Sequence, residues 1–330
     1  MSNLPLSFAV GDYDRNRALF DGRVQIDGVD PIFMQLEPEE IFFRAFRHQE
    51  FDCCEISFSS HVVSVSKGIE QYVAIPAFLS RAFRHSAIYI RTDKGIEKPE
   101  DLKGRKIGIA EYQLTANVWA RALLEDDHGV KPSDIQWIRG GMETADRPEK
   151  IKLELPADVS IEPAPVGKSL NDLLKAGEID GFVGPRALSC FDEGYPNVGR
   201  LFADVGAASR AYYERTSIFP IMHLLGLRKS IAAAHPWLPG ALYKAFEQSR
   251  QAALKALNDT AAAKVTLPFV EDYINQAKAL MGDDYWSYGV QQNHHVVDNF
   301  LEHHHRQGLS ARRVSVDELF HPGTLESFAL

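Results

Sequence analysis

The stretch FLSRAFRHSAIYIR, residues 78–91, places two arginines and a histidine directly before an alternating apolar run. Such alternation is typical of a half-buried strand, so the run predicts a strand over residues 86–90. Arg81, Arg84 and His85 then stand at the mouth of that strand. Two interpretations compete: a solvated cluster of surface charge, or a positive site in a chain whose formal net charge is -9.

The length and composition of the chain are those of an ordinary globular protein. The chain has 330 residues, of which 45% are hydrophobic and 25% charged, and at ~150 residues per domain this length predicts about two domains. The acidic balance argues against nucleic acid and against an anionic membrane as the main partner, because both bind basic surfaces. A small anionic ligand stays compatible, since it needs only a local positive site.

The sequence favours a cytoplasmic protein. Its first residues, MSNLPLSFAVGD, lack the basic segment and the long apolar segment of a secretory signal peptide. No stretch approaches the ~18 apolar residues of a membrane span. Cys53, Cys54 and Cys190 make a poor disulfide framework, which fits a reducing compartment. A mature exported protein is the alternative. The oligomeric state stays open, and a homo-oligomer is compatible with the sequence.

Apolar patterns predict strands that alternate with helices. The predicted strands cover residues 6–10, 51–58, 72–75, 86–90, 106–110, 179–183 and 221–227. The predicted helices cover residues 39–48, 115–124, 170–176, 238–257, 270–280 and 290–305, and a charged stretch rich in Pro and Gly predicts a surface excursion over 140–165. The alternation indicates an α/β fold with largely parallel sheets.

Ligands of such sheets bind at the carboxyl ends of the strands. Polar segments follow predicted strands at residues 12–15, 55–61, 111–115 and 185–186, and a fifth segment, 80–85, lies between two strands. Beside the opening cluster, these segments supply the further candidate site residues Arg15, Glu55, Ser57, Gln113, Thr115 and Arg186.

The opening cluster has the chemistry of an anion site. Arg81 and Arg84 are three residues apart, so on a turn or short helix their guanidiniums can point the same way and bind a carboxylate bidentately. His85, beside two cations, should favour its neutral form and be available as a base. The helix expected to begin at Gln113 to Thr115, with Thr115 as N-cap, offers free N–H groups to a second anionic group. The ligand is then expected to carry two acidic groups, or one acid held from both sides.

Other motifs carry less. VGKS at residues 166–169 lacks the earlier glycine of a phosphate-binding loop. The histidines at 294–295 and 303–305 raise a metal hypothesis, since neighbouring helical turns can converge on an ion. Only Asp298 and Glu302 are nearby carboxylates, and histidines on the polar side of a terminal helix are usually solvated. We therefore expect no metal at these histidines, with a divalent metal as the alternative. No motif for pyridoxal phosphate or thiamine diphosphate occurs, so we also expect no cofactor.

Long blocks of the chain resemble the 4,5-dihydroxyphthalate decarboxylases of bacterial phthalate degradation. They include IPAFLSRAFRHSAIYIRTD (75–93), DLKGRKIG (101–108), EYQLTANVWARA (111–122), DGFVGPRA (180–187) and SYGVQQNHHVVDNFLEHHHRQGLS (287–310). The resemblance implies a type II periplasmic-binding-protein fold, with two α/β lobes and the ligand in the cleft. Lobe one is then expected at residues 1–90 plus 205–330, and lobe two at residues 91–204.

The implied activity is the non-oxidative decarboxylation of 4,5-dihydroxyphthalate to 3,4-dihydroxybenzoate and carbon dioxide, which makes the protein a carboxy-lyase and an aromatic dicarboxylate its partner. One alternative is a solute-binding protein that delivers an aromatic acid to an ABC importer, because DLKGRKIG also resembles those proteins. Another lyase on the same scaffold, such as a chorismate-derived dehydratase, and a non-catalytic sensor are further alternatives.

Motif position and chemistry assign the anion-binding roles. Arg81 and Arg84, helped by the helix N-terminus at Thr115, are expected to bind the carboxylate that stays on the ring. Arg15 and Arg186, at the ends of other strands, are expected to complete the site.

Proton transfer needs a base and an acid. His85 or His223 is the expected base at a ring hydroxyl. Glu55 is the expected donor of a proton to the ring carbon, because a carboxyl group in a closed apolar site can be protonated at neutral pH.

Overall fold

A computed structural model describes residues 3–145 and 155–326 of the chain, which forms two compact units. The first unit comprises Met1–Arg81, Ile221–Asp298 and Val314–Leu330, and the second comprises Ala82–Pro220 and Asn299–Arg313. The chain therefore passes between these units after residues 81 and 220, whereas the lobes expected from the sequence meet at residues 90 and 204. Residues 299–313 belong to the second unit, although the expected lobe one includes them.

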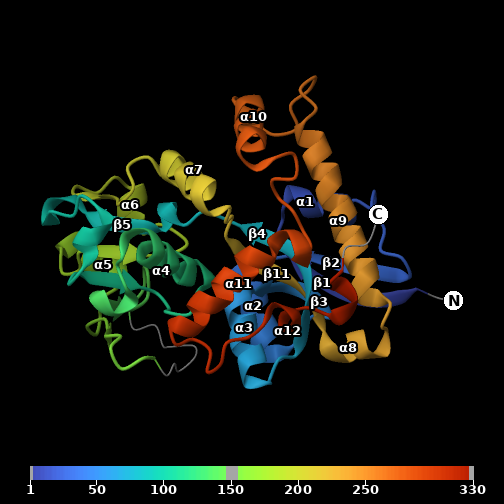
Figure 1. The fold of residues 1–330 in the computed structure, drawn as a ribbon, viewed down its shortest axis with the longest axis horizontal. Helices are drawn as coiled ribbons and strands as arrows, with labels where there is room; N and C mark the ends of the chain where they lie inside the picture. The colour runs from blue at the N-terminus through green and yellow to red at the C-terminus, as the bar shows by residue number, and fades with distance from the viewer. Residues whose placement is uncertain (1–2, 146–154, 327–330) are drawn as a thin grey trace. The chain divides into compact units, whose positions relative to one another are not determined.

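The first unit is built on a five-stranded sheet with the order β2-β1-β3-β11-β4 (Figure 1). β1 runs parallel to β2 and β3, whereas β11 runs antiparallel to β3 and β4. β1, β3 and β4 therefore have their carboxyl ends along one edge of the sheet, and β11 begins at that edge. The strands are β1 (Leu4–Val10), β2 (Val29–Gln35), β3 (Cys53–Ser57), β4 (Tyr72–Arg81) and β11 (Ile221–Arg228).

Helices connect and cover these strands. Ser57 ends β3 and also caps the next helix, because its side chain accepts a hydrogen bond from the N–H of Ser60. That helix stops at Gly68, whose φ of 66° is left-handed and suits a residue without a side chain. The helices are α1 (Asp14–Phe20), α2 (Pro38–His48), α3 (Phe58–Lys67), α8 (Lys229–Ala234), α9 (Leu238–Leu257), α10 (Val270–Met281), α12 (Val316–Leu319) and the first part of α11 (Val290–Arg306).

The second unit holds a six-stranded mixed sheet with the order β10-β5-β9-β6-β7-β8. β9, β6, β7 and β8 are parallel to one another, and β5 runs antiparallel to both β10 and β9. β6 and β9 therefore end at the edge where β5 begins. The strands are β5 (Ile88–Arg91), β6 (Lys106–Ile109), β7 (Gln136–Arg139), β8 (Ile161–Pro163), β9 (Gly181–Val183) and β10 (Val198–Arg200).

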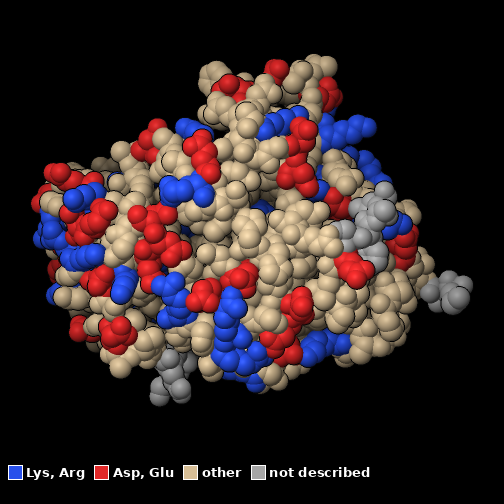
Figure 2. Space-filling model, viewed as in Figure 1, with Lys and Arg blue, Asp and Glu red and all other residues tan. Residues whose placement is uncertain are grey.

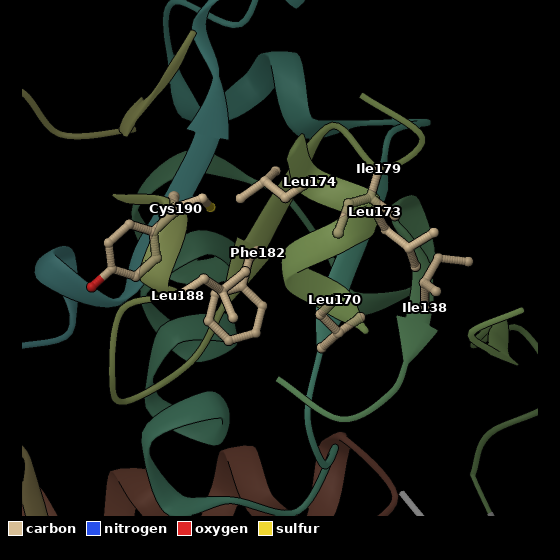
Figure 3. Close-up of a cluster of buried hydrophobic side chains, with 9 residues drawn as sticks. Ile138, Leu170, Leu173, Leu174, Ile179, Phe182, Leu188 and Cys190 are labelled. Atoms are coloured by element: carbon tan, nitrogen blue, oxygen red, sulfur yellow. The ribbon is translucent and has the colours of Figure 1, made fainter. Parts of the chain in front are cut away.

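The core of the second unit forms where a short helix covers the sheet. Leu170, Leu173 and Leu174 have the spacing that places side chains on one face of a helix, and they pack with Ile138 and Phe182 from the strands (Figure 3). The helices of this unit are α4 (Thr115–His128), α5 (Leu170–Ala176), α6 (Ser189–Asp192), α7 (Val205–Thr216) and the last part of α11.

The strand before the opening cluster is longer than predicted. β4 runs from Tyr72 to Arg81, whereas the pattern predicted its end at residue 75. The strand continues through Pro76 because β4 is the outermost strand of its sheet. A proline without an N–H is tolerated there, since no further strand needs that donor. Arg81 is thus the last residue of a strand and does not lie on a turn or helix.

Other differences have local causes. The polar segment at residues 12–15, expected as a turn, contains the start of α1, and the serine-rich end of β3 leads into α3. The structure adds β2, β7, β8, β10 and α7, whose short or mixed patterns gave no clear period. β8 lies inside the predicted excursion 140–165, of which residues 146–154 are outside the described residues.

The described surface carries both signs of charge. Lysine and arginine side chains alternate with aspartate and glutamate over the face in view (Figure 2). Within residues 3–145 and 155–326, no helix is at once long enough and apolar enough to cross a membrane.

A buried histidine joins two distant parts of the first unit. His61 on α3 is 1% exposed, and its Nε2 lies 3.1 Å from the carbonyl oxygen of Leu319 on α12. A carbonyl only accepts, so Nε2 carries the proton of a neutral ring. Burial lowers the pKa of His61 to about 4, against a smaller opposing effect of the Leu319 hydrogen bond.

We expect His61 to make the protein acid-labile. Between pH 6.5 and pH 4 the unfolded chain binds a proton at this residue and the folded chain does not, so stability falls as the pH falls through this window. His61→Gln keeps an N–H for Leu319 and should lose less stability from pH 7 to pH 5 than the wild type, by about 2 kcal/mol in urea unfolding. His48→Gln, at an exposed residue, is the control. Equal pH dependence of wild type and His61→Gln would contradict this role.

Candidate active site

One edge of the first sheet collects five of the sequence-predicted site residues. Ser57 ends β3 and Arg81 ends β4, while Glu55 lies two residues before the end of β3. His223, near the start of β11, pairs with Ser57 across the ladder. Arg15 follows β1 in the first turn of α1. The strand order therefore gathers these groups at the edge where α/β sheets bind ligands.

Glu55 is a carboxylate with no exposed surface. One oxygen accepts the N–H of Gly11 at 2.9 Å, and the other accepts the O–H of Tyr13 at 2.9 Å and lies 2.5 Å from Nδ1 of His223. Burial by itself raises a carboxyl pKa. The hydrogen bond and charge of His223, with the other two donors, outweigh that effect and hold the pKa of Glu55 below its usual range.

This environment does not fit the expectation of a protonated Glu55. Three donors converge on its two oxygens, which favours the ionised form. Tyr13 acts as one of those donors, because burial and the nearby Glu55 charge raise the pKa of its phenol. A Cβ at Gly11 would lie 2.5 Å from Cζ of Tyr13, so a side chain there would displace the phenol that donates to Glu55. Glu55 is thus suited to orient and stabilise a histidine, and not to donate a proton.

His223 has the geometry of a proton acceptor. Its Nδ1 faces the carboxylate of Glu55, so in the neutral ring Nδ1 carries the proton and Nε2 carries the lone pair. The ring also packs edge-on against Phe42, with 4.8 Å between ring centres. The side chain is 18% exposed, so Nε2 belongs to a ring that is fixed in orientation but still reachable.

The guanidinium of Arg15 packs against two aromatic rings. Its Cζ is 4.0 Å from the centre of the Tyr13 ring and 4.5 Å from that of the Trp286 ring. Its Nε donates to the carbonyl oxygen of Leu79 at 2.7 Å. With 13% of the side chain exposed, the cation is held by ring contacts and a hydrogen bond while it stays accessible to an anion.

Arg81, at the end of β4, is held by residues near the start of α11. Its Nη2 donates to the carbonyl oxygen of Ser287 at 2.7 Å and to the side-chain oxygen of Asn293. The side chain also lies over the ring of Phe78, at 5.0 Å from the ring centre. These partners come from β4 and from the segment before and within α11, so they fix a cation that is 7% exposed.

The second unit gathers the other five predicted residues at the equivalent edge of its own sheet. Arg84 and His85 precede β5, Gln113 and Thr115 follow β6, and Arg186 follows β9. Arg81 and Arg84 therefore belong to different units, although they are three residues apart in sequence.

His85 is neutral, as predicted, but for another reason. Its ring packs edge-on against Phe202 and Tyr212, and its Nδ1 lies 3.3 Å from the hydroxyl of Ser209. Burial, more than any nearby charge, lowers the pKa of His85 to about 4. A ring that resists protonation so strongly is a weak base near neutral pH.

The helix expected to bind a second anion begins close to its predicted position. α4 starts at Thr115, and its N-cap is Leu114, so Thr115 is the first helical residue and not the cap. The side chain of Gln113 donates to Glu111 at 2.8 Å. Arg186 is exposed, and Arg84 lines a small hollow beside aromatic side chains.

The histidines at 303–305 make contacts within the chain. Nε2 of His303 lies 2.7 Å from Asp126, and His304 and His305 contact Ser310 through their Nδ1 atoms. Among residues 3–145 and 155–326, no group of three or more His, Cys, Asp and Glu side chains is arranged to hold a metal ion.

Sequence reasoning missed three residues of the first edge. Tyr13 stands in the polar segment after β1, where an aromatic side chain was a usable signal. Trp286 and Asn293 lie more than 200 residues from the arginines that they contact, and nothing in their local pattern indicates that contact.

The fold is that of periplasmic solute-binding proteins, which confirms the expected fold class. The aliphatic sulphonate-binding protein SsuA of Escherichia coli aligns with a TM-score of 0.55 and 13% identity, over 100% of this chain and 96% of its own. SsuA of Xanthomonas axonopodis pv. citri, bound to MOPS, gives 0.53 and 10%, over 97% and 99%. At these identities the likeness shows the fold alone. A family model described as NMT1/THI5 like matches residues 34–150.

Two curated relatives make the relationship specific. A protein of Comamonas testosteroni is 59% identical over 330 residues, the whole of both chains. One of Pseudomonas putida is 57% identical over 217 residues, which cover 66% of this chain and 84% of its own. Both are named 4,5-dihydroxyphthalate decarboxylase. The chain belongs to the 4,5-dihydroxyphthalate decarboxylase family, and the resemblance found in the sequence is confirmed.

The Glu55 contact makes a prediction about the ring of His223. In ¹⁵N-edited NMR at a pH where the ring is neutral, Nδ1 should be protonated and Nε2 should not. In Glu55→Leu, which removes the acceptor, the Nε2–H form should appear. Asp52→Asn, at another carboxylate next to β3, should leave the His223 signals unchanged. A wild-type ring protonated on Nε2 would contradict this geometry.

Proposed function

We propose that this protein converts 4,5-dihydroxyphthalate to 3,4-dihydroxybenzoate and carbon dioxide without oxidation, as a carboxy-lyase of bacterial phthalate degradation. The relatives that carry this name, at 59% and 57% identity, support the substrate. The observation that carries the chemistry is the buried Glu55 carboxylate that orients His223 beside two arginines of the same sheet edge.

The chemistry defines what the site must supply. Each ring carboxylate is para to one hydroxyl. When that hydroxyl loses its proton to a base, electron density reaches the para carbon, which takes a proton from an acid or from solvent water. The bond to the carboxylate then breaks, carbon dioxide leaves, the ring regains its aromaticity, and the phenolate takes its proton back from the base. The site therefore needs a base at the hydroxyl, a proton source at the ring carbon and cations at the carboxylate that stays. The phenolate acts as the electron sink, so the reaction requires no organic cofactor.

His223 is the proposed base. Its Nε2 accepts the hydroxyl proton, and the imidazolium that results is stabilised by Glu55, whose carboxylate is 2.5 Å from Nδ1. Tyr13 and Gly11 keep Glu55 ionised throughout. His85, the other candidate, has a pKa of about 4 and a hydroxyl where His223 has a carboxylate, so it is the weaker base.

Arg15 and Arg81 are the proposed ligands of the carboxylate that stays on the ring. Both guanidiniums are pre-oriented at the edge that carries His223, and a planar fork suits a carboxylate. The substrate contacts predicted for Ser57, Arg84, Gln113, Thr115 and Arg186 stay predictions.

We also propose a reducing, cytoplasmic location. Cys53, Cys54 and Cys190 are all free and buried thiols. This is the state that a reducing compartment maintains.

Incubation of the purified protein with 4,5-dihydroxyphthalate tests the function directly. We expect carbon dioxide and 3,4-dihydroxybenzoate in equal amounts. The solute-binding alternative, favoured only by the fold, predicts tight binding with the substrate intact. Turnover of an enolpyruvyl compound, with no carbon dioxide from the dihydroxyphthalate, would indicate a different lyase.

The base can be identified by a pair of variants. His223→Asn keeps an N–H that can reach Glu55 but cannot take a proton, so kcat should fall by about 100-fold or more while KM changes little. His85→Asn should lower kcat by less than about tenfold. The reverse order in steady-state assays would move the base to His85.

The carboxylate grip is tested by arginine-to-lysine changes. Arg15→Lys or Arg81→Lys retains the charge but loses the planar fork, so KM should rise about tenfold or more. Arg228→Lys, at the opposite end of β11, is the matched control. Unchanged KM for both site variants would remove these arginines from the binding site.

A further inference from the structure

One short loop contacts both proposed carboxylate ligands. Residues 284–289, which we call the 284–289 loop, connect α10 to α11. The Trp286 ring lies 4.5 Å from Cζ of Arg15, and the carbonyl oxygen of Ser287 accepts a hydrogen bond from Arg81 at 2.7 Å. The position of this loop therefore sets the position of two guanidiniums, one from α1 and one from the end of β4.

The middle and end of the loop are fixed to the edge strand β4. The indole N–H of Trp286 donates to the carbonyl oxygen of Phe78 at 3.1 Å, and the N–H of Gly289 donates to that of Pro76 at 2.9 Å. An edge strand presents such carbonyls because no further strand pairs with it. The loop thus covers part of the outer side of β4.

The start of the loop is held by an ion pair with a buried arginine. Arg250 on α9 has 5% of its side chain exposed. Its Nε donates to Glu247 at 2.7 Å, and its Nη1 donates to Asp284, the first residue of the loop. Arg250 also lies over the ring of Tyr288, at 5.3 Å from the ring centre. One side chain therefore joins α9 to both ends of the loop.

Buried ionic groups add little net stability compared with apolar packing, because desolvation offsets the attraction between the charges. They do fix geometry, since each charge needs its partner in place. Binding of a carboxylate by a planar fork tolerates only about 0.5 Å of displacement. An ionic anchor at the start of a loop that orients two such forks meets this requirement.

We propose that Arg250 is a positioning residue of the carboxylate site: through Asp284 it fixes the 284–289 loop, and through Trp286 and Ser287 it orients Arg15 and Arg81. The proposal rests on the proposed function for the identity of the ligand. It assigns to Arg250 an effect on binding, and none on the proton transfer at His223.

Two variants test this role. Asp284→Ala removes a side chain that is 54% exposed and leaves the Glu247–Arg250 pair intact, so it should fold normally. Arg250→Met removes the anchor altogether. In both, KM for 4,5-dihydroxyphthalate should rise about fivefold or more while kcat stays within about twofold. The Kd of the product 3,4-dihydroxybenzoate, which keeps the gripped carboxylate, should rise by the same factor in calorimetry, and Asp284→Glu should restore it in part.

The control is Lys244→Met, which removes the ion pair of α9 with Asp27 and should change neither KM nor Kd. A merely structural role for Arg250 would reduce the folded fraction, and with it the apparent kcat, while KM and Kd stayed at wild-type values. That result would overturn the proposal. Wild-type protein that releases no carbon dioxide would instead overturn the proposed function, and the product Kd would still test Arg250.

Discussion

The buried charge of Glu55 is the constraint on which the first unit depends. A carboxylate inside a sheet is costly unless hydrogen bonds replace its water. Here the donors come from the end of β1, through Gly11 and Tyr13, and from β11, through His223. β3 can bury this charge because it lies between those two strands. The bonds that make the burial tolerable are the same bonds that orient the histidine, so fold and chemistry share one cause.

The sequence was sufficient to place several candidate site residues at the ends of strands. Strand ends read from apolar patterns, with the rule for α/β sheets, place Arg15, Glu55 and Ser57 at candidate site positions, and the structure has them at one edge with Arg81 and His223. The ionisation state of Glu55 was beyond that reasoning. It depends on a backbone N–H and on a histidine 168 residues away, and no local pattern states that β11 inserts between β3 and β4.

Closeness in the sequence did not show that Arg81 and Arg84 belong to different units. Arg81 and Arg84 are only three residues apart, which suggested one shared anion site. Arg81 is the last residue of β4, however, and Arg84 lies in the second unit. The strand length depended on Pro76 lying at a sheet edge, which is a tertiary property. The side chains that hold Arg81 and Arg15, such as Trp286, come from a loop whose importance appears only when it packs on β4.

Arg15 and Arg250 differ in the groups that contact them. The difference matches the two roles proposed for them, ligand binding by Arg15 and loop positioning by Arg250. Two aromatic rings and a carbonyl oxygen hold Arg15, with Asp14 at 3.4 Å as its acidic contact. Largely neutral partners orient a guanidinium without cancelling its charge. Arg250 instead faces two carboxylates at close range, so its charge is balanced within the protein. For a ring diacid, we propose that the first arrangement binds the ligand and that the second keeps Arg15 in place.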